Sequence, residues 1–373
     1  KRMTSPESVT VSTVAKNLKV PWDMVLTPDH SRIIFTERPG SVKSINLEKN
    51  NSVKTLFHRK KVLHWGEGGL MGLALHPEWE KGPKHQWIYL CETYGNYGSA
   101  QNQIVRVRRR TGDTHGFQVE PLIEGMPAAS YHDGCRLAFG PDNNLYATMG
   151  DAGQPSRAQN LQSYAGKILR LTPSGEPAPN NPFTDGRGDN ASVRDYVYSL
   201  GHRNPQGLAW HPETGQLYSS EHGPSGEFGL GGNDEINVIH PENNYGWPKI
   251  VGAPGITPYK DPLMLFPEPH LPPAGMDFHR WKSGTDYSLY VGSLRGELLL
   301  KANINQDDRD PRVTNIERWF EHSFFNGVYG RIRAVLGDKK GRLYIATSNR
   351  DGRGDPANND DRILVLTRES AEQ

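Results

Sequence analysis

The sequence has few cysteines and no long apolar run. Of its 373 residues only two are cysteine, Cys91 and Cys135. Two cysteines do not make a disulfide framework and are too few for a zinc site. They could form one bridge or remain two buried free thiols, and the sequence leaves both open. No stretch of 18 apolar residues occurs, which excludes a transmembrane helix.

The chain also lacks an excess of charge of either sign. It has 43 lysines and arginines against 42 aspartates and glutamates, which gives no support to a nucleic-acid or membrane-surface partner. The first residues, KRMTSPESV, lack the apolar core of a signal peptide. We therefore expect that such a peptide is either not used or already removed.

Long amphipathic helical patterns are scarce, and short β-rich runs between clusters of glycine, proline, asparagine and aspartate take their place. One pattern recurs along the chain. It consists of an apolar strand, a turn that combines proline or glycine with an acidic residue, and a strand that carries an aromatic residue. Its six copies span residues 25–38, 73–93, 137–151, 208–223, 276–294 and 334–349.

This repetition predicts an all-β fold, namely a six-bladed β-propeller of four-stranded antiparallel sheets. Each copy would supply part of one blade, and radial repetition leaves only short sheet edges. A solenoid of hairpins is the alternative, which the wide and uneven spacing of the copies disfavours. We expect a single propeller domain in residues 1–373, over about 20–366, with short tails at both ends.

The third copy contains a candidate base. His132 precedes its first strand and Asp151 follows its second, and an antiparallel pair brings both residues to the same end. A histidine beside a carboxylate is a candidate general base with the group that orients it. A buried histidine–aspartate hydrogen bond that only holds a loop is the alternative.

Other polar residues lie where the chain enters or leaves the repeats, and in a propeller these segments converge on one face. Several arginines in one funnel repel each other unless an anion lies between them, and guanidinium groups bind carboxylates bidentately. We therefore predict a polyanionic ligand of planar or multi-carboxylate character, while any single arginine could instead pair with a carboxylate on a strand. The converging set is Glu67, His132, Asp151, Arg203, Asn204, Arg295, Arg331 and Arg333.

A second group of loops, 221–224, 231–235 and 243–247, is rich in glycine, proline and asparagine. Such loops bend so that backbone carbonyls can face one point, and Ca²⁺ binds carbonyls together with carboxylates. A tight glycine-rich turn without a metal is the alternative. The glycine-rich stretch 66–72 lacks the lysine of a phosphate-binding loop, and we interpret it as a turn that leads into a blade.

Five motifs carry a family resemblance: YHDGCRLAFGPDNNLYATMGD (131–151), AGKILRL (165–171), GHRNPQGLAWHP (201–212), SEHGPSG with NDEINVI and NNYGWP (220–248), and GRIRAV (330–335). Together they resemble the soluble pyrroloquinoline quinone (PQQ) dehydrogenases. The nearest branch is the aldose sugar dehydrogenases, relatives of soluble quinoprotein glucose dehydrogenase. The resemblance covers about residues 20–366, and the family fold is a six-bladed propeller with PQQ on its axis.

The resemblance implies PQQ- and Ca²⁺-dependent oxidation of aldose sugars at the C1 hydroxyl to lactones. His132 would take the hydroxyl proton while hydride moves to the quinone C5, Asp151 would orient His132, and Arg203 would stabilise the developing negative charge. Electrons would then pass to an external acceptor. The residues implied to bind PQQ are Glu67, His132, Arg203, Asn204, Arg295, Arg331 and Arg333.

Two calcium sites are implied as well. The carbonyls of Gly223 and Pro224 would hold an active-site Ca²⁺, and Glu235 with the carbonyl of Tyr245 would hold a structural one. Glu67 stands where the glucose dehydrogenases carry a glutamine, and the long insertions of that branch are missing. We therefore expect an open site, broad aldose substrates, a monomer, and a periplasmic or secreted location.

Two other functions remain open. A non-enzymatic propeller binding module, related to hedgehog-interacting proteins, would not need His132, Asp151, Arg203 and the pair Arg331 and Arg333 together. A calcium-dependent lactonase on the same architecture would place several carboxylates around an axial Ca²⁺. The funnel predicted here is rich in arginine instead, which suits an anionic cofactor better.

Overall fold

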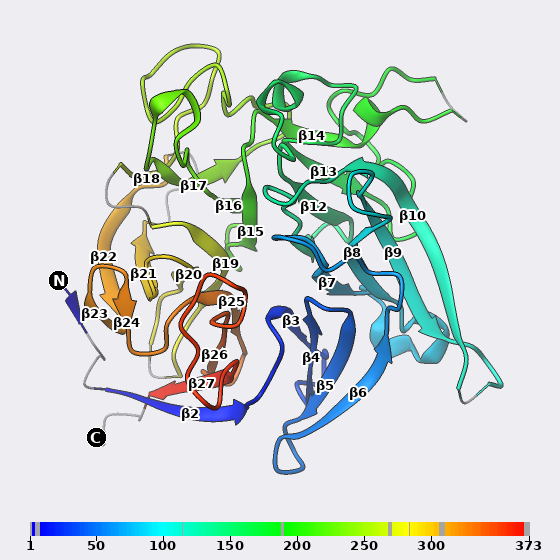
Figure 1. Cartoon of the computed structure of the whole chain (residues 1–373), viewed down its shortest axis with the longest axis vertical. Helices are drawn as coiled ribbons and strands as arrows, with labels where there is room; N and C mark the ends of the chain where they lie inside the picture. The colour runs from blue at the N-terminus through cyan, green and yellow to red at the C-terminus, as the bar shows by residue number, and fades with distance from the viewer. Residues whose placement is uncertain are drawn as a thin grey trace.

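The computed structural model describes residues 2–3, 8–113, 115–187, 190–267, 271–282, 284–305 and 310–368. Six sheets stand around a central axis, each built on four antiparallel strands, and one of them has a short fifth strand (Figure 1). The predicted six-bladed β-propeller is therefore confirmed. Helical structure in the described residues is limited to five short 3₁₀ turns, η1 (Trp79–Lys81), η2 (Pro83–His85), η3 (Pro155–Gln159), η4 (Val193–Tyr196) and η5 (Glu227–Gly229).

The blades follow the chain in order. Blade 1 contains β3 (Pro21–Leu26), β4 (Arg32–Glu37), β5 (Ser41–Asn46) and β6 (Ser52–His58), and blade 2 contains β7 (Leu70–Leu75), β8 (Ile88–Tyr94), β9 (Gln101–Arg109) and β10 (Phe117–Pro127). Blade 3 contains β11 (Leu137–Phe139), β12 (Leu145–Met149), β13 (Lys167–Leu171) and β14 (Val197–Leu200). Blade 4 contains β15 (Pro205–Trp210), β16 (Leu217–Glu221), β17 (Asp234–Ile239) and β18 (Met264–Phe266).

Blade 5 contains β19 (Pro273–His279), β20 (Ser288–Ser293), β21 (Leu298–Ile304) and β22 (Val313–Trp319), and the two-residue strand β1 (Arg2–Met3) adds to β22 in parallel. A small ribbon, β23 (Glu321–Ser323) with β24 (Asn326–Gly327), follows it. Blade 6 contains β25 (Ile332–Gly337), β26 (Leu343–Thr347), β27 (Ile363–Arg368) and β2 (Val9–Ala15). Each of the six predicted repeats coincides with the first hairpin of one blade.

Blade 6 joins the two ends of the described chain. Its outer strand β2 pairs antiparallel with β27, with Val9 opposite Arg368. We expected the residues before about 20 to form a short tail, and this expectation is wrong for residues 9–15. The segment VTVSTVA is rich in the β-branched residues valine and threonine, as strands are, and it covers the edge that β27 would otherwise expose.

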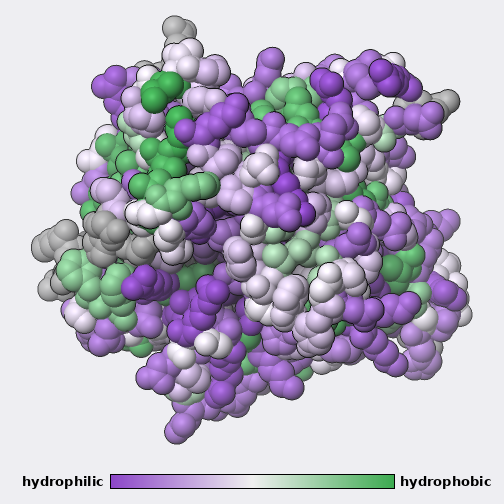
Figure 2. Space-filling view, turned by 45° about the horizontal axis from the view of Figure 1, so that its top comes forward, coloured by the Kyte–Doolittle hydropathy of each residue, from purple (hydrophilic) through white to green (hydrophobic). Residues whose placement is uncertain are grey.

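The first strands of successive blades contact one another in a closed ring, from β3 through β7, β11, β15, β19 and β25 back to β3. Because neighbouring blades pack face to face, strands near the axis are largely buried, and the second strands of blades 3 and 6, β12 and β26, are buried along their whole length. The surface seen in Figure 2 is mainly hydrophilic, with separate hydrophobic patches. Among the described residues no helix is long and apolar enough to cross a membrane.

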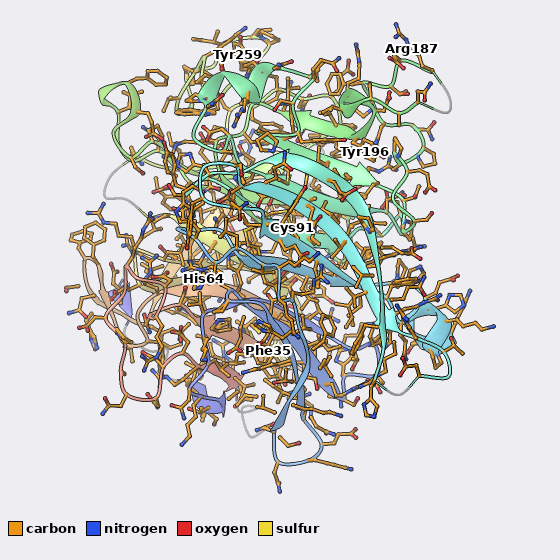
Figure 3. All side chains as sticks on the ribbon, turned by 45° about the vertical axis from the view of Figure 1, so that its right-hand side comes forward. Phe35, His64, Cys91, Arg187, Tyr196 and Tyr259 are labelled. Carbon is orange, nitrogen blue, oxygen red and sulfur yellow. A yellow bond between two sulfur atoms is a disulfide. The ribbon has the colours of Figure 1, made fainter. Side chains whose placement is uncertain are left out.

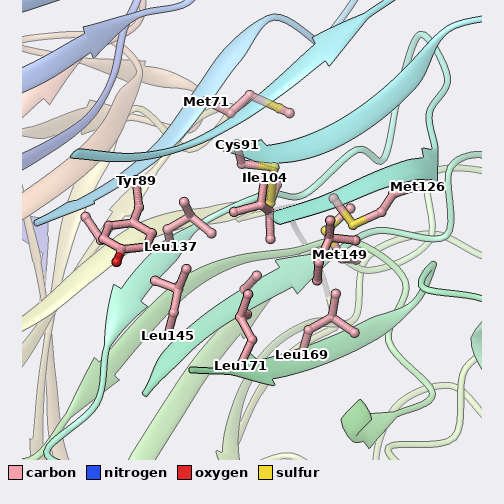
Figure 4. Close-up of a cluster of buried hydrophobic side chains, with 14 of the residues drawn as sticks. Met71, Tyr89, Cys91, Ile104, Met126, Leu137, Leu145, Met149, Leu169 and Leu171 are labelled. Carbon is pink, nitrogen blue, oxygen red and sulfur yellow. A yellow bond between two sulfur atoms is a disulfide. The ribbon is translucent and has the colours of Figure 1, made fainter. Parts of the chain in front are cut away.

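The two cysteines are joined in the core between blades 2 and 3. Cys91 on β8 forms a disulfide with Cys135, which precedes β11, and both are fully buried. Figure 4 shows Cys91 beside Met71 and Ile104, with Leu137 and Met149 in the same cluster, and Figure 3 marks its place in the whole molecule. Of the two possibilities that the sequence left open, the structure therefore contains the bridge.

A buried guanidinium group closes the centre of the ring. Arg136 donates hydrogen bonds to the backbone carbonyls of Trp22, Gln206 and Arg333, which belong to blades 1, 4 and 6. Its charge is balanced by Asp23 at 3.0 Å, and it also lies 4.1 Å from the centre of the Trp22 ring. Asp23 in turn accepts a bond from the Leu73 backbone of blade 2. One ion pair thus connects five of the six blades at the axis.

Candidate functional site

A cavity of about 320 Å³ lies where the connections between blades converge. Loops from every blade contribute to its wall. Most of these loops either connect the last strand of one blade to the first strand of the next or follow the second strand of a blade. Five residues predicted to converge, Glu67, His132, Arg203, Arg295 and Arg331, line it directly. The other lining residues are His222, Gly223, Ser225, Asp234, Pro272, Leu294 and Arg353.

His132 and Asp151 meet at the end of the β11–β12 hairpin. The Nδ1 of His132 lies 2.8 Å from the Oδ1 of Asp151. A carboxylate only accepts, so Nδ1 carries the proton and Nε2 presents its lone pair to the cavity. Asp151 is fully buried and accepts two further hydrogen bonds, from the Gly153 backbone and from the indole Nε1 of Trp247. This arrangement fixes the tautomer and the direction of the histidine ring.

The backbone of His132 is held as firmly as its ring. His132 adopts a φ of +60°, a conformation that costs free energy for a residue other than glycine. Its N–H donates to Glu67 Oε2 at 2.9 Å, and Glu67 Oε1 accepts from Arg353 at 2.9 Å. Strained backbone of this kind persists where the surroundings determine it, and it is frequent at functional sites.

Arg203 faces His132 across the cavity and is nearly buried. Its Nε and Nη2 atoms both donate to Oε1 of Glu227, and its Nη1 donates to the carbonyl of His222. The same Glu227 oxygen lies 3.9 Å from Nε2 of His132. Burial raises the pKa of Glu227, but the Arg203 charge together with hydrogen bonds from the loop backbone and from Arg203 outweighs burial, and the pKa lies below its usual value. Glu227 was not predicted from the sequence.

Arg331 and Arg333 share one carboxylate. Arg331 Nε and Arg333 Nη2 donate to the same oxygen of Asp351, at 2.9 and 3.0 Å. Burial opposes ionisation of Asp351, yet the two guanidinium groups, Arg333 foremost, lower its pKa to about 2. Burial lowers the pKa of Arg333 to about 10, so it remains charged at neutral pH. In this part of the site the two guanidinium cations of Arg331 and Arg333 therefore share the single carboxylate anion of Asp351.

The arginines thus differ from the predicted funnel of unpaired charges. Arg203, Arg331 and Arg333 each bond to a carboxylate of the chain itself, which is the alternative that the sequence left open for single arginines. Those carboxylates lie on the loops that leave β16 and β26, not on strands. Arg295, in the turn between β20 and β21, stacks on the ring of Phe325 at 4.5 Å.

A buried imidazole completes the floor of the cavity. His222 lines the main cavity and a smaller adjoining one, and its Nε2 is buried without a hydrogen-bond partner among the described residues. Its Nδ1 lies 3.4 Å from Nδ2 of the fully buried Asn204. Burial, with the nearby Arg203 charge, places the pKa of His222 well below its usual value, so the ring is neutral. A neutral buried nitrogen without a partner is a place where a ligand can bind.

Backbone oxygens surround Gly223 at the cavity wall. A Cβ at this position would lie 2.1 Å from the carbonyl oxygen of Gly232 and 2.3 Å from that of Asn233, so only glycine fits. The Gly223 N–H donates to Asp234, whose other oxygen accepts from Leu271. Carbonyl oxygens gathered beside a buried carboxylate are the donor set that Ca²⁺ prefers.

A second group of carboxylates lies within blade 4. Glu235 on β17 is directly opposite Glu221 on β16. Burial, followed by the charge of Glu221, raises the pKa of Glu235 well above its usual value. Asp234 and Asp261 add to the same effect. Tyr245 lies nearby, with its ring stacked on His202, which itself bonds to Glu221.

Several residues of the site were missed by reasoning from the sequence. Trp247 and His222 stand inside the quoted motifs NNYGWP and SEHGPSG, so those motifs could have drawn attention to them. Glu227 and Arg353 lie in irregular loops with no periodic pattern, and nothing in the sequence alone pairs them with Arg203 and Glu67.

Comparison with known proteins gives a consistent result. The family model described as Glucose / Sorbosone dehydrogenase matches residues 18–364. A Thermus thermophilus structure, assigned as an oxidoreductase (glucose dehydrogenase), is 42% identical with a TM-score of 0.83, over 96% of this chain and 99% of that one. The PQQ-bound aldose sugar dehydrogenase of Streptomyces coelicolor is 34% identical with a TM-score of 0.78, over 98% of this chain and 100% of that one.

A curated relative with a longer chain also matches. Quinoprotein glucose dehydrogenase B of Acinetobacter calcoaceticus is 34% identical over 276 residues, which are 66% of this chain and 53% of that protein. The match thus spans about half the length of that relative.

Proposed function

This chain belongs to the glucose / sorbosone dehydrogenase family, and from that premise we propose that it is a PQQ-dependent aldose sugar dehydrogenase. It would oxidise the C1 hydroxyl of aldoses to lactones and pass the electrons to an external acceptor. The observation that carries this proposal is the orientation of the His132 ring. Its Nδ1 is fixed by Asp151 at 2.8 Å, while its Nε2 faces a cavity lined by four arginines and by Glu67.

The residues of the cavity suit PQQ, a planar quinone with three carboxylates. Arg203, Arg295, Arg331 and Arg333 supply guanidinium groups, which bind carboxylates with two parallel hydrogen bonds. The neutral ring of His222 lines the same cavity. Arg331 and Arg333 together exceed the single charge of Asp351, so an anionic group fits beside them. These residues, with Asn204 next to His222, would hold the cofactor.

The chemistry of the step divides between the cofactor and the chain. When bound, PQQ with Ca²⁺ accepts the hydride that leaves the sugar C1. His132 Nε2 accepts the proton of the C1 hydroxyl as general base. Asp151 keeps the ring in the required tautomer and stabilises the charged imidazolium, and Trp247 and Gly153 hold Asp151 in place. Arg203, which also lines the cavity, would supply positive charge where negative charge develops.

Calcium is part of the same proposal. The carbonyls of Gly223 and Pro224 would hold the ion near the cofactor, and the crowding of carbonyl oxygens around Gly223 supports this. Glu235 and the carbonyl of Tyr245 would hold a second ion. Because burial and Glu221 raise the pKa of Glu235, a bound cation would offset the cost of placing its charge there.

We also infer a periplasmic or secreted location and a monomer. The buried disulfide Cys91–Cys135 supports the location, because such bridges persist mainly in oxidising compartments.

The test of the proposal is reconstitution followed by a single substitution. Apo-protein with PQQ and Ca²⁺ should reduce a redox dye when aldoses are added. His132→Ala should then lose about 10² to 10⁴ in turnover, the usual contribution of a general base, while it still takes up PQQ. His115→Ala, an exposed histidine on the β9–β10 turn, is the control and should keep full turnover.

Two outcomes would contradict the proposal. Full turnover of His132→Ala would show that another group is the base. No uptake of PQQ and no dye reduction with any aldose would favour the non-enzymatic binding module instead.

A further inference from the structure

The loop between β16 and β17, residues 222–233, carries a carboxylate into the cavity. Glu227 lies in the 3₁₀ turn η5 and reaches Arg203 on the neighbouring connection between β14 and β15. One oxygen, Oε1, accepts from both Nε and Nη2 of Arg203 and lies 3.9 Å from Nε2 of His132. A carboxylate of the chain therefore stands between the arginine and the histidine whose free nitrogen faces the cavity.

The contact between Arg203 and Glu227 resembles the contact that an arginine makes with a bound anionic ligand. Two guanidinium donors on one carboxylate make a charge-assisted pair, and the second oxygen, Oε2, accepts from the Ser225 backbone at 2.6 Å. Arg203 is buried, while the Glu227 side chain keeps 27% of its surface exposed. The arginine thus belongs to the wall of the site, and the glutamate approaches from the solvent side.

The turn that carries Glu227 is closed by its own backbone hydrogen bonds. Gly226 donates to the carbonyl of Leu230, and Leu230 donates to that of Glu227, so the turn can move as one unit. Phe228 adopts a φ of +55°, which is unfavourable for a residue other than glycine, and its side chain is 68% exposed. Its contact with Trp247 has ring centres 6.0 Å apart. Little apolar area is lost when such a turn swings outward.

We propose that Glu227 is an internal ligand of the anion subsite formed by Arg203 beside His132, and that any anionic ligand must displace it to bind. This inference rests on the proposed function, because it assigns that subsite to the bound cofactor. The carboxylate of the chain shows which chemistry the subsite accepts, namely an anionic oxygen that accepts from both Nε and Nη2 of Arg203.

The consequence is a competition inside the molecule. A ligand whose subsite is free in only a fraction of molecules binds with an apparent affinity reduced by that fraction. Removing the charge of Glu227 frees Arg203 and should raise the affinity for an anion. It should also speed association, because fewer molecules have to open first.

The experiment measures PQQ binding to apo-protein in Ca²⁺ buffer by quenching of intrinsic fluorescence, both at equilibrium and by stopped flow. Glu227→Gln keeps the size of the side chain and should bind PQQ about three- to tenfold faster and tighter than wild type. Glu227→Ala should change in the same direction, which guards against a new hydrogen bond made by glutamine. Glu213→Gln, on the far turn of the same blade, is the control and should match wild type.

A second readout follows the loop itself. Hydrogen exchange of residues 225–231 in wild type should become faster when PQQ is saturating, since Glu227 is then released. Wild type that takes up PQQ, with both Glu227 variants at the wild-type rate and affinity, would overturn the internal ligand and leave the proposed function standing. Wild type that takes up no PQQ would overturn the proposed function and this inference together.

Discussion

At the scale of single residues, the site combines a predicted pair with unpredicted partners. His132 and Asp151 could be placed together from the sequence because they flank one hairpin, whose strands must return to the same end. The bonds of Trp247 to Asp151 and of Glu227 to Arg203 come from other blades. No local rule of sequence connects residues whose proximity depends on the packing of irregular loops.

Asp133 provides a test of electrostatics next to the candidate base. It is buried, its Oδ1 accepts from Asn102 and from the Ala129 backbone, and its Oδ2 has no partner among the described residues. Burial raises its pKa to about 7 from the usual 3.8. Between about pH 4 and pH 7 the folded protein therefore binds a proton at Asp133 that the unfolded chain has lost. The contribution of Asp133 to the free energy of unfolding falls as pH rises from about 4 to about 7 and is constant above that.

Asp133→Asn should therefore remove this part of the pH dependence. The free energy of unfolding of the variant minus that of wild type should increase by up to about 4 kcal/mol between pH 4 and pH 8. Urea unfolding of both apo-proteins at several pH values measures the difference, in which the other titrating groups cancel. A difference that is flat with pH would show that Asp133 ionises normally in the fold.

At the scale of structural elements, the hairpins were predictable and the links between blades were not. The six repeats matched the first two strands of each blade because alternation and turn residues are local signals. The Cys91–Cys135 bridge depends instead on how blade 2 stacks on blade 3, and the sequence left it undecided.

The bridge closes a loop of 44 residues and should contribute about 2–4 kcal/mol by restricting the unfolded chain. Cys91→Ala, Cys135→Ala and the double variant should all unfold at lower temperature than wild type, and by similar amounts, because either single change opens the same bridge. Calorimetry under non-reducing conditions measures this. Single variants as stable as wild type would mean that the bridge does not stabilise the fold.

At the scale of the whole molecule, the number of blades followed from the count of repeats, but the centre of the ring did not. No sequence pattern singled out Arg136, whereas in the structure it bonds to carbonyls of three other blades and to Asp23. Burial lowers the pKa of Arg136 and raises that of Asp23. The pair therefore depends on both partners being present.

Arg136→Met should destabilise the propeller by about 3–5 kcal/mol, because it leaves Asp23 as an unpaired buried carboxylate and frees three carbonyls. Arg280→Met is a suitable control, since Arg280 is exposed and lies 3.8 Å from Glu213, and surface pairs contribute only about 0–1 kcal/mol. Urea unfolding monitored by tryptophan fluorescence compares the two. An equal loss of stability in both variants would show that the axial ion pair contributes no more than a surface ion pair.

The pairing of β2 with β27 also determines when the propeller can close. Residue 9 is made long before residue 368, yet the two face each other in one sheet. Five blades can assemble from neighbouring segments of the chain, but the sixth cannot form until β27 has been made. Until then the first strand has no partner, and a chain stalled late in synthesis would expose an open ring to other proteins.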